Sequence, residues 1–117
     1  MLVHDLKDSQ GRVFAFEVPN FVLGRSGAVA IVRSIPRVRL IRGPVRWSWF
    51  REESFCEFKV DSRRFVIWEP FGDNSRYWVG PEPPAWCEEV DVVRRAFLRA
   101  RPWSARLSAL YQRRRSQ

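Results

Sequence analysis

Short apolar runs with period-two alternation predict most of the regular structure of this chain. Residues 13–18 are rich in β-forming side chains and stop at Pro19-Asn20, which predicts a first strand. In 37–42, Val38 and Leu40 alternate with arginines, and Gly43-Pro44 ends the run. Two further strands are predicted at residues 45–50, where Val45, Trp47 and Trp49 share a face, and at 76–79.

The clearest supersecondary pattern is a hairpin. Residues 54–60 and 64–68 are aromatic-rich runs joined by Asp61-Ser62-Arg63. Alternation places apolar side chains on both faces of this hairpin. Either helices cover both faces, which is the commoner arrangement, or one face is an exposed aromatic surface that binds a partner.

Two segments have helical periodicity. Residues 26–35 carry an apolar stripe at i, i+3, i+4 and i+7, ended by Pro36, although the β-branched content leaves a strand open. After the stiff crossover 80–84, the second stripe recurs at i, i+4, i+7 and i+11, so we expect its members to be buried against the sheet. The two stripes are Ala28, Ile31, Val32 and Ile35, and then Trp86, Val90, Val93 and Phe97.

Pro102 either ends this helix or begins another, in which Trp103, Leu107, Leu110 and Tyr111 align. The predicted fold class is therefore α+β: a mostly antiparallel sheet of about five strands, with one short helix after the first strand and one or two C-terminal helices packed on it. We expect residues 1–111 to form a single domain and residues 112–117 to be a basic, disordered tail.

Composition narrows the class of protein. Six Trp and nine Phe in 117 residues indicate a dense core, an aromatic binding face, or both. The first eight residues lack the apolar segment of an export signal, and no apolar run approaches the length of a membrane span. We therefore expect a cytoplasmic protein, not bound to membranes, with Cys56 and Cys87 as reduced, buried thiols.

The net charge of +8 is unevenly distributed. Residues 1–24 carry −1, 25–51 carry +7, 52–91 carry −6 and 92–117 carry +8, so the first 91 residues are neutral as a whole. The acidic block can pair internally with either basic block. Nineteen Arg against two Lys suits recognition surfaces, although a codon bias would have the same effect.

Catalytic and metal-binding patterns are missing from the sequence. His4 is the only histidine and is predicted to lie in a mobile terminus, and the two cysteines are distant, so neither a nucleophile–histidine pair nor a metal-ligand spacing is present. There is no glycine-rich phosphate loop. Carboxylate pairs could in principle cleave glycosidic bonds, but an acidic antiparallel sheet produces them by chance. We expect no enzyme activity, no metal and no small-molecule cofactor; the carboxylates weighed are Glu52, Glu53, Glu57, Glu69 and Asp73.

The segment 69–78 is the predicted recognition loop. Turn-forming residues stand between two aromatic pairs, beside an arginine. Alternatively, Asp73 and Asn74 close an Asx-turn while Arg76 pairs with Glu69. The candidate binding residues are Asp73, Asn74, Arg76, Tyr77 and Trp78.

Two functions follow as hypotheses. The first is a non-catalytic protein-binding module, such as a small bacterial immunity-like or adaptor protein, because Trp and Arg dominate interface hot spots. The alternative is a nucleic-acid-binding protein with Trp or Tyr stacking, against which the acidic central block counts. Its basic surface would comprise Arg37, Arg39, Arg42, Arg46, Arg113, Arg114 and Arg115.

Overall fold

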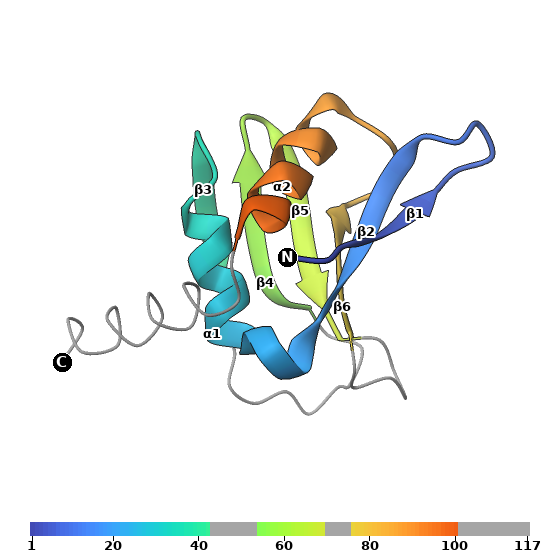
Figure 1. Ribbon diagram of the computed structural model, residues 1–117. Helices are drawn as coiled ribbons and strands as arrows, with labels where there is room; N and C mark the ends of the chain where they lie inside the picture. Colours follow the sequence, from blue (N-terminus) through green and yellow to red (C-terminus); the bar gives the residue numbers. More distant parts are fainter. Residues whose placement is uncertain (43–53, 70–75, 101–117) are drawn as a thin grey trace, which may run out of the picture.

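The computed structural model describes residues 1–42, 54–69 and 76–100 of the chain (Figure 1). These residues form six strands and two helices. In chain order they are β1 (His4–Lys7), β2 (Val13–Pro19), α1 (Asn20–Arg33), β3 (Val38–Arg42), β4 (Ser54–Val60), β5 (Arg63–Trp68), β6 (Arg76–Pro81) and α2 (Glu88–Arg99).

The strands form one sheet in the order β1-β2-β6-β5-β4-β3, and every neighbouring pair is antiparallel. Helix α1 carries the chain across the sheet from β2 to the far edge at β3. The chain then returns strand by strand until β6 lies beside β2. The predicted α+β class is confirmed, with one more strand than expected.

Both helices pack on the same face of the sheet (Figure 1). The predicted α1 stripe, Ala28, Ile31, Val32 and Ile35, is buried throughout. Its partners are the alternate strand positions that cross-strand pairing places on one face. Rings contact within this core, as Phe16 and Phe97 meet edge to face with centroids 5.4 Å apart. The strand residues of this core are Phe16, Val18, Phe55, Cys56, Phe58, Val60, Phe65, Ile67, Tyr77 and Val79.

The N-terminal segment, predicted to be mobile, instead forms the edge strand β1. Its middle position Asp5 accepts two hydrogen bonds from Arg94 of α2, at 2.7 and 2.8 Å. The ammonium group of Met1 also donates to the carbonyl oxygens of Leu98 and Ala100, both at 2.8 Å. Contacts to a helix almost a hundred residues away therefore hold this strand.

Helix α1 begins earlier than its stripe predicts. It starts at Asn20 and bends at Gly24, whose φ of 70° and ψ of 166° interrupt the helical backbone. That left-handed φ favours glycine. The helix ends at Arg33, two residues before the predicted end. Ser34 donates its hydroxyl to the Ile31 carbonyl at 2.6 Å, and Pro36 follows.

Three of the four residues in the predicted α2 stripe, Val90, Val93 and Phe97, are buried. Trp86 is the exception, and the prediction that it is buried is wrong, since 37% of it is exposed. The helix begins at Glu88, after Cys87 in extended conformation, so Trp86 lies before the helix and outside its phase. The predicted strand at 45–50, the second helix after Pro102 and the tail 112–117 lie outside the described residues.

Candidate binding surface

The sheet face opposite α1 and α2 is the candidate site, and we call it the open face. Directly paired residues of antiparallel strands point to the same side, so the register identifies its members. No helix of the described part of the chain packs on it. Its residues include His4 and Leu6 on β1, Ala15, Glu17 and Pro19 on β2, Arg39 on β3, Glu57 and Lys59 on β4, Arg64, Val66 and Trp68 on β5, and Arg76, Trp78 and Gly80 on β6.

Two tryptophans lie on the two central strands of this face, β5 and β6. Trp68 and Trp78 are cross-strand partners whose ring centroids are 5.9 Å apart at an interplanar angle of 57°. Both are half-buried. Such a pair offers a large, rigid apolar surface, and each indole carries an N–H that can donate a hydrogen bond.

Small residues make room for this tryptophan pair. A Cβ atom added to Gly80 would lie 2.7 Å from Cη2 of Trp78 and 2.8 Å from the Ala15 methyl carbon. The six-membered ring of the Trp78 indole therefore occupies the space that a side chain at position 80 would need. Ala15, Val66 and Gly80 are buried although they face away from the helices. Other residues of the open face therefore bury these three. The sequence had left two alternatives for the apolar residues of this face: burial beneath helices, or an exposed surface.

Charged pairs flank the tryptophans. Arg64 donates to Glu57 at 2.9 Å on one side, and Arg76 lies 3.6 Å from Glu17 on the other. The hydrogen bond that Arg64 donates to Glu57 raises the pKa of Arg64, which stays charged. In contrast, Arg39 and Lys59 form no ion pair with any residue that the structure describes, although they are cross-strand partners of the same sign. The surface therefore presents both signs of charge together with two uncompensated cations.

The predicted recognition loop is divided by this geometry. Arg76 is exposed and Trp78 half-buried, both on the open face. Tyr77 belongs to the core with 4% exposed, so it offers no surface to a partner. Asp73 and Asn74 lie outside the described residues. The alternative ion pair between Arg76 and Glu69 does not form, because Glu69 accepts from Arg25 of α1 at 2.8 Å.

A second cluster surrounds Tyr77 on the helix side. The ring of Phe55 meets Tyr77 edge to face at 4.8 Å, and the guanidinium of Arg25 lies 4.8 Å from the centre of the Phe55 ring. Burial, with a smaller effect of the Glu69 carboxylate, raises the pKa of Tyr77 to about 12. This tyrosine therefore stays neutral near pH 7 and has a packing role.

The predicted basic surface is only partly described. Arg37 and Arg39 are exposed, and Arg37 lies 3.4 Å from Asp61 in the turn between β4 and β5. Arg42 ends β3. Arg46, Arg113, Arg114 and Arg115 lie outside the described residues. Sequence reasoning missed Trp68, Lys59 and Glu17 as site residues, because only the strand order brings them onto one face with Trp78.

Groups suited to catalysis are not brought together in the described ranges. His4 is exposed on β1. Glu57 and Glu69 each bind an arginine, on the open face and the helix side respectively. No three His, Cys, Asp or Glu side chains of the described residues are placed to hold a metal ion. Cys56 is buried and Cys87 half-buried, and no disulfide joins them; burial raises the pKa of Cys87.

No protein-family model, curated protein or solved structure matches this chain. Among the described helices, none has the length and apolar character needed to cross a membrane.

Proposed function

We propose that this protein is a non-catalytic binding module that docks on another protein through the open face. The observation that carries the proposal is the Trp68–Trp78 pair, which lies on the two central strands of a sheet face that no described helix covers. Half-buried aromatic anchors ringed by polar groups are typical of interface hot spots. A small adaptor or an immunity-like inhibitor would use such a surface.

The charges around the tryptophans favour a protein over a nucleic acid. Glu17 stands directly opposite Trp78, and Glu57 lies one row away on the same face. A phosphate backbone following the tryptophans would pass both carboxylates, and their repulsion would offset part of the gain from Arg76 and Arg64. A protein surface can place one group of matching sign opposite each of these charges.

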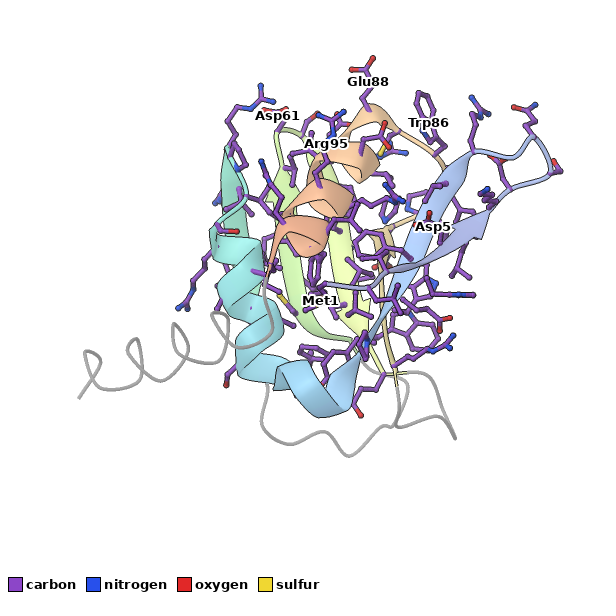
Figure 2. All side chains as sticks on the ribbon, in the orientation of Figure 1. Met1, Asp5, Asp61, Trp86, Glu88 and Arg95 are labelled. Carbon is purple, nitrogen blue, oxygen red and sulfur yellow. The ribbon has the colours of Figure 1, made fainter. Side chains whose placement is uncertain are left out.

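A capture experiment with matched tryptophan variants tests this proposal. The immobilised full chain is exposed to cell lysate with and without nuclease, using wild type, Trp68→Ala and Trp86→Ala. Trp86 is a suitable control because it lies between the start of α2 and the β1–β2 hairpin, with the Arg12 guanidinium 5.0 Å from its ring centre (Figure 2).

We expect a protein that survives nuclease treatment, is kept by Trp86→Ala and is lost from Trp68→Ala. Its purified form should bind the Trp68→Ala variant roughly tenfold or more weakly, as truncation of a tryptophan hot spot does. Thermal melts of each variant exclude unfolding as the cause. Equal capture by both variants, or capture only of nucleic acid, contradicts the proposal.

A further inference from the structure

Three cations lie side by side at one corner of the open face, and we call them the basic corner: Arg39, Lys59 and Arg64. Arg39 pairs across β3 and β4 with Lys59, which pairs across β4 and β5 with Arg64. Like charges in directly opposite positions of a sheet destabilise it. A fold that carries such a row gains from an anion placed over it.

Only one member of the basic corner is neutralised within the described chain. Arg64 binds Glu57 at 2.9 Å and approaches Glu82 at 4.0 Å. Arg39 is exposed and Lys59 partly exposed, and neither has an ion pair there. Within the described residues, an anionic partner could therefore bind Arg39 and Lys59 without breaking an ion pair.

The basic corner has a fixed distance from the tryptophan pair. Lys59 is the cross-strand partner of Arg64, which lies four residues before Trp68 on β5, so the positions of Lys59 and Trp68 are about 14 Å apart. Between them lies the row that contains Glu57 and Val66. A ligand that touches both ends therefore needs an anion at one end, an apolar group at the other, and no strong negative charge between them.

This pattern separates two classes of macromolecule. A nucleic-acid strand carries a phosphate at every nucleotide, so it would bring negative charge over Glu57 as well. A polypeptide can confine its carboxylates to one end. An extended segment rises about 3.3 Å per residue, so the two contacts would be separated by roughly four residues.

Resting on the proposed function, we infer that the partner is a protein segment with a carboxylate pair and, about four residues away, a large apolar or aromatic side chain. The carboxylates lie over Arg39 and Lys59, and the apolar side chain lies on Trp68 and Trp78. The positions of the cations and the tryptophans on the open face therefore determine both the chemistry and the spacing of the recognised segment.

A peptide selection tests the inference directly. A displayed library of random dodecapeptides is selected on the full-length wild type, on Arg39→Glu/Lys59→Glu, and on Arg95→Glu/Arg99→Glu. The last variant makes the same change of net charge on α2, where both arginines are exposed (Figure 2 labels Arg95). Thermal melts check that each variant is folded.

We expect the wild type and the α2 control to enrich the same peptides, with Asp or Glu spaced about four residues from Trp, Phe or Leu. The basic-corner variant should lose these peptides and bind them at least about tenfold more weakly in fluorescence anisotropy, because attraction becomes repulsion. Raising the salt concentration should weaken the wild type more than this variant.

The possible failures are distinguishable. Peptides without acidic residues that still require Trp68 would refute the partner chemistry and leave the open face as a binding surface. Enriched peptides that are indifferent to both the basic corner and Trp68, or no enrichment on any variant, would count against the proposed function as well. Binding of a fluorescent oligothymidylate that Arg39→Glu/Lys59→Glu abolishes would overturn the protein partner in favour of a nucleic acid.

Discussion

At the scale of single residues, the open face depends on what is missing beneath Trp78. Gly80 has no side chain and Ala15 only a methyl group, so the indole can lie against the strands. Because this contact is between a backbone position and a rigid ring, it leaves little space for adjustment. The contact between Trp78 and Gly80 therefore determines the shape of the surface and the position of Trp78 relative to Trp68.

Gly80→Ala should therefore displace Trp78. The added Cβ would approach Cη2 of Trp78 and the Ala15 methyl to distances that real atoms do not adopt. We expect unfolding by denaturant to show a loss of about 1–3 kcal/mol, as overpacking does, together with a change in tryptophan emission. Ser62→Ala, at an exposed turn position, is the control and should change stability by less than about 0.5 kcal/mol. An equally small change for Gly80→Ala would mean that the indole is not held in this way.

Predictions about single residues are wrong where they rely on neighbours in the sequence instead of neighbours in the sheet. The sequence suggested Glu69 as an ion-pair partner of Arg76, but the strand order places Arg76 beside Glu17 instead. Tyr77 and Trp78 look equivalent in the sequence, and only their alternate positions on β6 decide that one is buried and the other belongs to the surface. A period-two pattern separates two faces without saying which face the helices cover.

At the scale of elements, helix α2 tests how far a periodic stripe can be extended. Its apolar positions from Val90 onward follow the helical period, and the charges match the helix dipole, with acids in the first turn and Arg99 in the last. Trp86 continues the same numerical spacing, but it follows Pro83 and Pro84, where the backbone is not helical. The helix begins at Glu88, so only three residues of the predicted stripe, Val90, Val93 and Phe97, belong to it.

Alanine substitution should separate the true member of the stripe from the false one. Phe97 is fully buried against Phe16, so Phe97→Ala should cost about 3–5 kcal/mol. Trp86→Ala removes a ring that is 37% exposed, and we expect a loss of roughly 1 kcal/mol, chiefly from its contact with Arg12. Equilibrium unfolding in denaturant measures both. Similar losses for the two variants would show that Trp86 has a share in the core.

The strands show what pattern alone can find. Five of the six were predicted, because alternation and turn residues mark them. The sixth strand, β1, has one apolar residue, Leu6; its other residues are His4, Asp5 and Lys7. This strand is held in place by its pairing with β2 and by the hydrogen bond between Asp5 and Arg94, which are 89 residues apart. Such a contact leaves no local trace in the sequence.

The Asp5–Arg94 pair should make the attachment of β1 dependent on pH. Hydrogen bonds from Arg94 hold the pKa of Asp5 below its ordinary value, against the opposite effect of burial. A lowered carboxylate pKa stabilises the fold above the unfolded-state value of about 4, and this contribution is lost as the pH falls through the folded-state value. Asp5→Asn should therefore be about 1 kcal/mol less stable than wild type at pH 7.

Measuring the free energy of unfolding from pH 7 downward checks this expectation. The difference between wild type and Asp5→Asn should shrink once the pH drops below about 4. Asp61→Asn is the comparison, since its exposed pair with Arg37 at 3.4 Å should contribute less than about 0.5 kcal/mol. A difference between wild type and Asp5→Asn that does not vary with pH would show that the ion pair does not hold β1.

At the scale of the whole molecule, charge is the property most easily misread. The excess of +8 equals the charge of residues 92–117, and the first 91 residues sum to zero. Within the described part of the chain, arginines such as Arg25, Arg64 and Arg94 are bound by acids. The basic character that favours nucleic acid in the composition is therefore partly neutralised in the folded sheet and helices, and Arg39 and Lys59 are among the cations for which the described part of the chain supplies no ion pair.

Removing residues 113–117 separates the two kinds of partner. If binding is through the open face, the deletion should change the dissociation rate of a bound protein or selected peptide by less than about twofold, since contacts that set this rate are short-ranged. Arg39→Glu/Lys59→Glu, which leaves the terminus intact, should raise that rate markedly.

If the protein instead binds duplex DNA through Arg113, Arg114 and Arg115, the deletion should weaken binding to all DNA sequences alike. It should also lower the slope of log affinity against log salt by roughly 2–3, because each neutralised phosphate contributes about 0.9. Surface plasmon resonance across a salt series measures both quantities on the same variants. We expect the first result, because residues 1–91 carry no net charge with which a folded nucleic-acid domain would attract phosphates.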